Sequence, residues 1–194
     1  MSASPAPVVL ASSSVYRRRL LARLITDFEC LSPQIDESRL DNETPAALAA
    51  RLAQTKALTC AAQRPGAVVL GSDQVPALDD EILHKPGSHE RAIRQLERCS
   101  GQAVIFYTAV AILGPQTGTC DCHVDETTVR FRDLDPADIE HYLQVDKPYD
   151  CAGSFKVESR GVTLFERIES SDPTGLQGLP LIWVAARLRE RGII

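Results

Sequence analysis

Short apolar runs and amphipathic stretches alternate along this chain of 194 residues. The β-branched run Val8–Ala11 is followed by three serines and then by Val15–Leu24, whose leucines fall on one face at helical spacing. Ser13 or Ser14 is a natural N-cap for this helix. The pattern therefore predicts a strand, a tight loop and a helix in succession.

The same two periodicities extend over the rest of the chain. Helices are expected where a capping side chain or proline precedes apolar positions three or four residues apart, and strands where apolar residues form a run or alternate. The predicted strands span Phe28–Leu31, Ala67–Leu70, Val104–Leu113, Thr127–Arg132 and Val162–Ile168. The predicted helices cover Pro45–Gln63, the stretch from Ser88 to Ser100, the stretch after Asp135-Pro136, and Leu181–Arg191.

Helices and strands alternate, and a turn at residues 114–118 makes a hairpin of the two strands that flank it. No internal repeat, low-complexity tract or long linker interrupts the chain. The sequence therefore predicts one compact α/β domain over residues 1–194, built on a mixed sheet, with residues 1–7 as a flexible N-terminal extension.

Composition narrows the class of protein. Hydrophobic residues make up 44% of the chain and charged residues 24%, with a formal net charge of −5. These values are typical of a globular protein and argue against a broad basic surface for nucleic acid. The longest apolar run, Val104–Leu113, is well short of the roughly 20 residues that span a membrane. The start of the chain lacks the basic segment of a signal peptide. We expect a cytoplasmic protein without nucleic-acid or membrane partners.

Six cysteines could suggest disulfides, but in a reducing compartment we expect most of them to be free thiols, several of them packed as small apolar side chains. Cys120 and Cys122 precede His123 in the one local cluster. Their spacing is not one that zinc sites use, and no second Cys/His pair lies nearby in the sequence. The role of Cys120 and Cys122 stays open.

Ser12, Ser13 and Ser14 lie where the first strand passes into the first helix, and Arg17 follows in its first turns. Backbone N–H groups, hydroxyls and the positive end of a helix favour an anion here. Arginine can also bind two phosphate oxygens at once. A capped helix with a solvated basic face explains the same residues equally well. The segment is not a P-loop, because no Gly-x-x-x-x-Gly-Lys-Ser/Thr sequence occurs.

Asp73 follows an apolar run within a Gly-Ser-Asp-Gln sequence, so we expect it at the carboxyl end of a strand, where α/β sheets collect ligands. It could act there as a general base or hold a hard cation such as Mg²⁺, although taken alone a loop aspartate with local turn bonds is the simpler interpretation. Asp36 and Glu37 form a second carboxylate pair. Lys56 and Lys85 add ammonium groups that suit phosphoryl chemistry, although isolated lysines usually lie in solvent.

Gly153 and Phe155 mark a third segment of interest. Gly153 would allow another group to approach the backbone closely. Phe155 would either pack in the core, which is the better interpretation in isolation, or stack on a ligand. His84, His89 and His141 show no spacing typical of a catalytic triad or a zinc site, so we expect them on the surface.

Taken in order, these segments resemble the Maf family of nucleoside triphosphate pyrophosphatases. The segments that carry the resemblance are Leu10–Ser14 with Arg17 and Arg18, Asp36-Glu37, Lys56, Gly71–Gln74, Lys85-Pro86, Ser100-Gly101, Cys151–Phe155 and Gly178–Leu181. They extend over nearly the whole chain. The segments that look most like the subfamily acting on 7-methyl-GTP are Gly71–Gln74, Phe155-Lys156 and Thr163–Arg167. Branches of the family that prefer dTTP or UTP more often carry a threonine after the aspartate.

The resemblance implies a twisted mixed sheet flanked by helices, with two lobes around a deep substrate cleft as in Maf and ITPase-like proteins. It implies that Asp73 is the proton acceptor and that a divalent cation, Mg²⁺ or Mn²⁺, is required. It suggests a homodimer. The residues that it places in the site are Glu37 and Asp73 for the metal, Ser12, Arg17, Lys56 and Lys85 for the phosphates, and Tyr16, Gln74 and Glu158 for base preference.

Two positions depart from the family pattern, which usually has proline at Val15 and glycine at Ser159. The second adjoins the base pocket, so it bears on the substrate more than on the reaction. Guanine methylated at N7 carries a positive charge, which Tyr16 could attract by a cation–π contact and Glu158 could pair with. Gln74 could both donate and accept, which suits the O6 edge of the base.

We therefore expect an enzyme that hydrolyses 7-methyl-GTP to the monophosphate and pyrophosphate, and so removes modified nucleotides before they enter nucleic acids. One alternative is the same reaction on dTTP, UTP or another non-standard nucleotide. Another is a nucleotide-binding regulator of cell division without relevant turnover. Retention of the acidic and basic groups that hydrolysis needs favours the enzyme.

Overall fold

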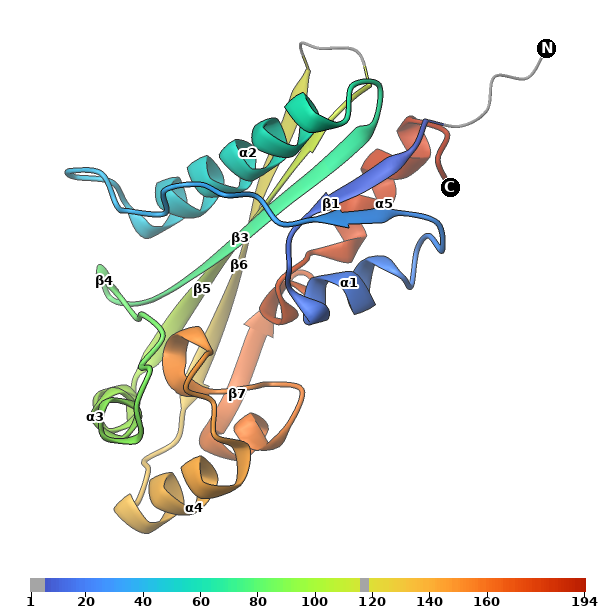
Figure 1. Cartoon of the computed structure of the whole chain (residues 1–194). Helices are drawn as coiled ribbons and strands as arrows, with labels where there is room; N and C mark the ends of the chain where they lie inside the picture. The colour runs from blue at the N-terminus through green and yellow to red at the C-terminus, as the bar shows by residue number, and fades with distance from the viewer. Residues whose placement is uncertain (1–5, 116–118) are drawn as a thin grey trace. The chain divides into compact units, whose positions relative to one another are not determined.

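The computed structural model describes residues 6–115 and 119–194, and helices and strands alternate within them (Figure 1). The strands are β1 (Val8–Ala11), β2 (Glu29–Leu31), β3 (Val68–Leu78), β4 (Glu81–Ile82), β5 (Ala103–Leu113), β6 (Cys120–Phe131) and β7 (Phe165–Ser170). The α-helices are α1 (Val15–Leu21), α2 (Pro45–Gln63), α3 (His89–Cys99), α4 (Pro136–Asp146) and α5 (Leu181–Glu190). The expected N-terminal extension and the turn at 114–118 lie partly outside the described residues.

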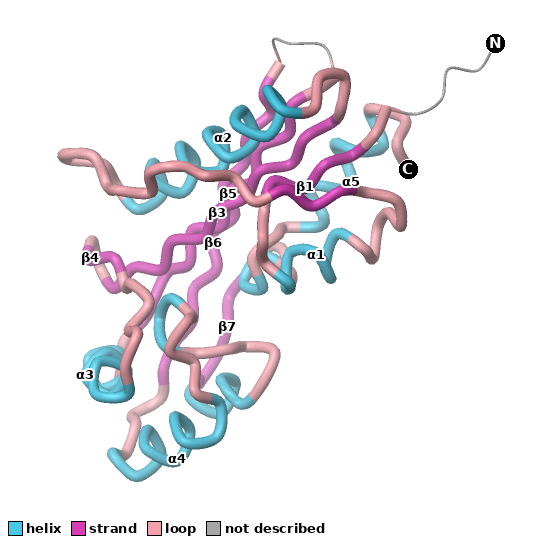
Figure 2. The backbone as a smooth tube through the Cα atoms, in the orientation of Figure 1, coloured by secondary structure: helices cyan, strands magenta, loops and turns pink. Residues whose placement is uncertain are grey.

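The strands form a mixed sheet in the order β2-β1-β3-β5-β6-β7, with β4 paired to β3 (Figure 2). β1 runs parallel to both of its neighbours, so that Ala11 lies opposite Leu31 on one side and Gly71 on the other. β4 is antiparallel to β3, and β7 is antiparallel to β6. The predicted α/β class with a mixed sheet is confirmed.

The chain divides into two compact units. The first comprises the residues up to Gln74 together with Thr108–Asp125 and Asp172–Ile194. The second comprises Val75–Tyr107 and Glu126–Ser171. Three of the four boundaries fall inside β3, β5 and β6, so each of these strands contributes residues to both units, and the fourth follows β7. A single domain over the whole chain stays a prediction.

In the first unit, alternate residues of the central strands face opposite layers of helix. Val8 and Leu10 of β1 and Val68 and Leu70 of β3 pack with α1 and α5 on one side, whereas α2 lies on the other (Figure 1). The buried cluster comprises Val8, Leu10, Leu20, Leu21, Val68, Leu70, Val110, Ile112, Leu179, Leu181, Val184 and Leu188. Full burial of one such side chain contributes about 1.5–3 kcal/mol, so this cluster holds α1 and α5 against the strands.

The second unit contains an aromatic cluster. Phe155 meets Phe106 and Phe165 edge to face, with ring centroids 5.2 and 4.8 Å apart, and Phe131 at 5.8 Å. Phe155 is buried, which confirms the interpretation of its ring as a packing group. His89 is half-buried instead of lying free on the surface, because Tyr149 and Glu140 each lie 2.9 Å from its ring nitrogens.

Helix starts agree with the local signals, because Ser14, Thr44, Ser88 and Asp135 each accept a hydrogen bond from a backbone N–H in the first turn. Three strand boundaries differ from the predictions. β3 continues to Leu78, so that Asp73 lies within the strand and not at its end. Polar side chains can stay inside this strand because each finds a partner there.

The other two differences concern β6 and β7. β6 begins at Cys120, whose neighbours lack the β-branched pattern typical of strands. Residues Arg160–Leu164 form a 3₁₀ helix instead of the start of a strand. Gly161 explains this turn, because a Cβ atom there would collide with the backbone of Lys156.

The six cysteines are free thiols, as predicted. Cys60 and Cys99 are buried, and burial raises the pKa of Cys99 to about 12.

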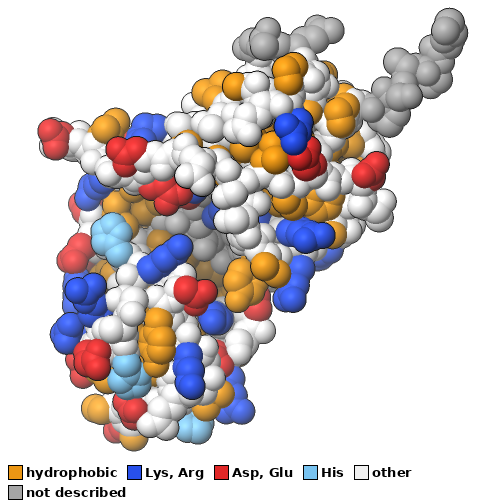
Figure 3. All heavy atoms as spheres, in the orientation of Figure 1, with side chains coloured by type: hydrophobic (Ala, Val, Ile, Leu, Met, Phe, Trp, Pro, Cys, Tyr) orange, Lys and Arg blue, Asp and Glu red, His pale blue; other side chains and the backbone are white. Residues whose placement is uncertain are grey.

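Within residues 6–115 and 119–194, no helix combines the length and apolar composition needed to cross a membrane. Acidic and basic side chains are interspersed over the face shown in Figure 3.

Candidate functional site

The middle of β3 brings Asp73 against α2. Gly71 and Asp73 face the same side, because side chains alternate along a strand. A Cβ atom at position 71 would overlap the carbonyl oxygen of Ala53 and lie 2.6 Å from the backbone nitrogen of Ala57. The missing side chain therefore lets α2 pack directly on β3, which brings Lys56 up to Asp73.

Lys56 joins two carboxylates in the first unit. Its Nζ lies 2.6 Å from Oδ1 of Asp73 and 2.6 Å from Oε1 of Glu37. The side chains of Lys56 and Asp73 are 9% and 12% exposed, whereas that of Glu37 is 59% exposed. A buried ammonium needs such partners, because its removal from water is costly without them. The cluster is therefore a buried ion pair that a second carboxylate reaches from the solvent side.

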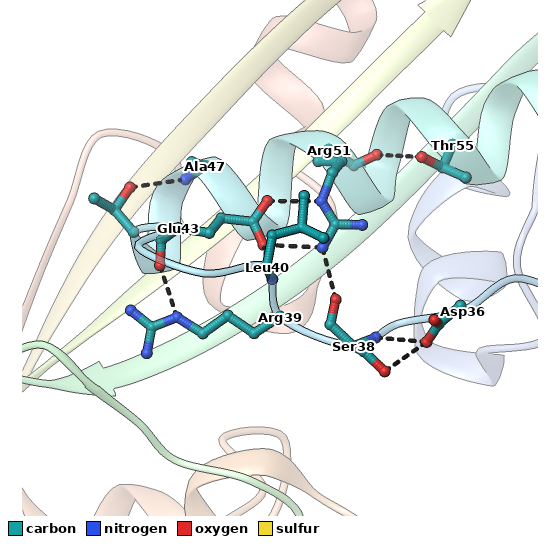
Figure 4. Close-up of polar contacts among 9 residues, drawn as sticks. Asp36, Ser38, Arg39, Leu40, Glu43, Ala47, Arg51 and Thr55 are labelled. Carbon is teal, nitrogen blue, oxygen red and sulfur yellow. Dashed lines mark hydrogen bonds and ion pairs between the residues drawn. The ribbon is translucent and has the colours of Figure 1, made fainter.

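The loop that carries Glu37 is fastened to α2 (Figure 4). Arg51 of α2 donates from Nε and Nη2 to the carboxylate of Glu43, at 2.7 and 2.9 Å, and from Nη2 to the carbonyl of Ser38 at 2.8 Å. Glu43 also accepts from the N–H of Leu40 at 3.1 Å. The hydrogen bonds from Arg51 are the main reason why the pKa of Glu43 falls to about 2. These contacts hold the loop on both sides of its turn.

Asp36, the other member of the predicted carboxylate pair, shapes the turn itself. Its Oδ1 accepts from the hydroxyl and the N–H of Ser38 at 2.6 and 2.9 Å (Figure 4). These two bonds lower the pKa of Asp36. Of the two neighbouring carboxylates, Glu37 is the one that the loop presents to Lys56.

The serine-rich turn caps α1. Ser14 Oγ accepts from the N–H of Arg17 at 3.3 Å, and the buried Ser12 accepts from the N–H of Ser14 at 3.1 Å. Tyr16 is partly buried in the first turn of the helix. The capped-helix interpretation is confirmed, and the binding of an anion at this turn stays a prediction.

Arg17 and Ser72 share the carbonyl oxygen of Gly178. Arg17 Nε donates to it at 3.0 Å and Ser72 Oγ at 2.9 Å. Gly178 has a φ of +108°, a conformation that glycine adopts without strain. Burial lowers the pKa of Arg17, whereas the charges of Asp73 and Glu37 act in the opposite direction. The guanidinium is therefore within electrostatic range of the Asp73 cluster.

Gln74 lies on the other face of β3, against the loop Asp172–Gly178. Three acceptors lie within hydrogen-bond distance of Nε2 and share its two hydrogens: the carbonyl oxygens of Gly175 and Leu176 at 3.1 and 3.0 Å, and Thr108 Oγ1 at 2.9 Å. The amide nitrogen is thus engaged by the protein. The donation from Gln74 to a base that the sequence suggests does not fit this arrangement, whereas acceptance by the amide oxygen does.

Lys85 and Glu158 are exposed residues of the second unit. Burial by neighbouring atoms raises the pKa of Glu158, while its own N–H and the charge of Lys156 oppose the shift. The participation of Lys85 in phosphate binding and of Glu158 in base selection stays a prediction.

Sequence reasoning misses four residues that hold this arrangement. Arg51 and Glu43 carry a signal, because opposite charges flank the start of a helix that also bears Lys56. Thr108 is a hydroxyl within an otherwise apolar strand, a position where a buried partner is expected. Asp172 has no local signal beyond the proline after it.

Glu37 and Asp73 could hold a divalent cation. Both carboxylates contact the Lys56 ammonium, through Oε1 of Glu37 and Oδ1 of Asp73, and this contact brings them close to each other. Mg²⁺ typically takes one or two carboxylates and completes its octahedron with water and substrate phosphates. Two carboxylates fit that use, and across the described part of the chain no group of three or more His, Cys, Asp or Glu side chains is arranged to hold a metal.

Comparison with solved structures supports the fold. The structure of the Staphylococcus aureus Ham1 protein aligns with a TM-score of 0.57 at 13% sequence identity, over 95% of this chain and 98% of that one. At this identity the likeness concerns the arrangement of helices and strands alone.

Comparison of sequences extends over nearly the full length. A protein of Albidiferax ferrireducens named 7-methyl-GTP pyrophosphatase is 48% identical over 96% of this chain and 94% of its own. One of Xanthomonas axonopodis pv. citri with the same name is 51% identical over 95% and 96%. The family model described as Maf-like protein matches residues 7–191. The chain therefore belongs to the Maf family.

Proposed function

We propose that this protein is a nucleoside triphosphate pyrophosphatase that hydrolyses 7-methyl-GTP to 7-methyl-GMP and pyrophosphate. The observation that carries the reaction is the buried Asp73–Lys56 pair, which Glu37 also reaches. The substrate is suggested by the names of relatives about half identical to this chain. Clearance of a methylated nucleotide before its incorporation into nucleic acid, in the cytoplasm, follows as the role.

In the proposed reaction, Asp73 accepts a proton from water while the water oxygen bonds to the α-phosphorus. The bond between that phosphorus and the oxygen bridging to the β-phosphate breaks, and pyrophosphate departs with the electron pair. A general base of this kind typically contributes 10²–10⁴-fold to a rate. Lys56 keeps Asp73 and Glu37 close together although their charges repel.

Cationic groups would bind the triphosphate. Arg17 is held by Gly178 in range of Asp73, and Ser12 lies in the same turn. Lys85 of the second unit would add a further ammonium. A divalent cation held by Glu37 and Asp73 would supply positive charge that offsets the charge on the phosphates.

Base selection would involve Tyr16, Gln74 and Glu158. A tyrosine ring can attract the positive charge of N7-methylguanine. Glu158 can pair with the same charge, and Gln74 can accept a hydrogen bond from the base through its amide oxygen. A homodimer is part of the same proposal.

A panel of triphosphates tests the substrate. The wild-type protein is incubated with Mg²⁺ and 7-methyl-GTP, GTP, dTTP, UTP or ITP, and pyrophosphate and monophosphate are measured. The highest kcat/KM is expected for 7-methyl-GTP. A higher value for dTTP or UTP would assign the same reaction to another nucleotide, and binding without product would support a regulator of cell division.

A further inference from the structure

We infer that Thr108 and the buried Asp172 are positioning residues, which fix the Gln74 amide so that its carbonyl oxygen alone is offered to the nucleotide base. The inference rests on the proposed function for its substrate. Its geometric part concerns only residues of the first unit.

The orientation of the Gln74 amide follows from its neighbours. Its Nε2 lies 3.1 Å from the carbonyl oxygen of Gly175 and 3.0 Å from that of Leu176. A backbone carbonyl can only accept, so the group facing both of them must be the one that carries hydrogens. A flipped amide would place its oxygen against two other oxygens with no proton between them.

Thr108 reinforces this orientation with a single hydroxyl. Its side chain is fully buried, and Oγ1 donates to the Gly175 carbonyl at 3.0 Å. Because that bond uses the hydroxyl proton, Oγ1 can only accept from Gln74 Nε2, which lies at 2.9 Å. The Thr108 hydroxyl, the Gln74 amide nitrogen and the Gly175 carbonyl oxygen are thus each within hydrogen-bond distance of the other two.

Asp172 fixes the loop from which the carbonyls project. Its Oδ1 accepts from the hydroxyl and the N–H of Thr174 at 2.6 and 2.9 Å, and its Oδ2 accepts from the N–H of Ile182 at 2.6 Å. Thr174 Oγ1 accepts in turn from the N–H of Leu181 at 2.8 Å. The carboxylate therefore joins the loop to the first turn of α5, which the hydrophobic core already holds.

The fixed amide leaves one group for a ligand. Gln74 is half-buried, and within the described residues Arg187 Nε is the one side-chain nitrogen or oxygen that is fully buried without a partner, so the Gln74 oxygen is not sealed in the core unpaired. An acceptor held in one orientation favours a ring N–H, as at N1 of guanine, over the bare ring nitrogen at N1 of adenine. An amide free to rotate would accommodate both.

The test compares 7-methyl-GTP with 7-methyl-ATP, so that the methyl group and its charge are constant. Thr108→Val keeps the side-chain shape and removes the hydroxyl. It is expected to lower the ratio of the two kcat/KM values about five-fold, the effect of one ordinary hydrogen bond. Thr108→Ser should restore the ratio. Asp172→Asn, which replaces one acceptor oxygen by a donor, should lower it in the same direction.

The control is Thr59→Val, because the half-buried Thr59 bonds within α2 to the carbonyl of Thr55. It should leave the ratio unchanged. A fall of both kcat/KM values by the same factor in Thr108→Val, with the ratio kept, would show a merely structural role and overturn the inference.

A ligand-free measurement separates this inference from the proposed function. The ¹H–¹⁵N signals of the Gln74 side-chain amide should exchange slowly with solvent in the wild-type protein and faster in Thr108→Val. Free exchange in the wild-type protein would contradict the positioning. Absence of turnover with every triphosphate, together with slow exchange of this amide, would contradict the proposed function and leave the geometric part standing.

Discussion

Two loops hold the candidate site of the first unit, and they are built on opposite principles. The loop of residues 36–42 is exposed, and it is fastened to α2 by the ion pair of Arg51 with Glu43, whose side chains are 29% and 8% exposed (Figure 4). The loop Asp172–Gly178 is largely buried and is held by the Asp172 carboxylate and by backbone carbonyls. The first presents Glu37 to Lys56, and the second fixes Arg17 and Gln74.

The contrast suggests a division of tasks. An ion pair with one partner open to solvent, as Arg51 is, typically contributes modestly to stability and responds to salt and pH. Buried hydrogen-bond networks are costly to break, because each orphaned group loses water as well as its partner. We therefore expect substitution of Glu43, which anchors the loop of Glu37, to lower the stability of the protein less than substitution of Asp172. We expect the loop Asp172–Gly178, which contacts Gln74, to be the more rigid of the two.

The largest loss of stability is expected from a substitution in β3, the strand that carries both Asp73 and Gln74. Gly71→Ala would drive a methyl group into the backbone of Ala53 and Ala57 and push α2 from β3. The loss should be about 3 kcal/mol of unfolding free energy, the upper part of the usual range for overpacking, measured by urea denaturation. Gly66→Ala is the control, because a Cβ there meets nothing within 4 Å and only the positive φ is strained. Equal losses in both variants would contradict the close packing at Gly71.

A direct comparison of the two anchors comes next. Asp172→Ala removes the acceptor of three hydrogen bonds and should lower the unfolding free energy by about 2 kcal/mol. Glu43→Ala should cost less, because its partner Arg51 is 29% exposed and its guanidinium can hydrogen-bond to water when the carboxylate is removed. Denaturation curves of both variants give the comparison, and a greater loss in Glu43→Ala would reverse it.

A smaller effect is expected from acid. Glu43 has a pKa of about 2 in the folded protein, below its usual value of about 4.5. A depressed carboxylate pKa stabilises the fold above the usual value, and that stability is lost as the pH falls from about 4.5 toward 2. Urea unfolding between pH 6 and pH 3 should therefore show a steeper loss for the wild-type protein than for Glu43→Gln. Parallel curves would mean that the pair with Arg51 contributes nothing.

The smallest effect is that of salt. Addition of 1 M NaCl should narrow the stability difference between wild type and Glu43→Gln, since the ion pair is screened. The difference between wild type and Asp172→Asn should hardly change, because its hydrogen bonds are buried. A salt response of equal size in both comparisons would remove the distinction between the loops.

Local signals predict much of the fold. The start of α1 after Ser14 and the start of α2 at Pro45 can be predicted, because the Ser14 and Thr44 side chains accept hydrogen bonds from backbone N–H groups only three residues away. The extent of β3 could not be predicted, because the buried polar residues after Gly71 find their partners far away in the sequence.

The candidate site is predictable only in part. Asp73 and Lys56 stand out by residue type, and the structure brings them into contact at 2.6 Å, whereas their roles in a site stay a prediction. The hydrogen bond from Arg17 to the carbonyl oxygen of Gly178 could not be predicted, because every residue has a backbone carbonyl and the residue type does not show which one will accept. The same holds for the carbonyls that orient Gln74.

The most direct test of the account is the rate of pyrophosphate release from 7-methyl-GTP by Asp73→Asn. Asparagine keeps the shape of the side chain but cannot serve as the proton acceptor. The account predicts an unchanged circular dichroism spectrum and a kcat lower by about 10²–10⁴-fold, with Asp27→Asn, an exposed substitution, as the matched control. Turnover near the wild-type rate in Asp73→Asn would contradict it.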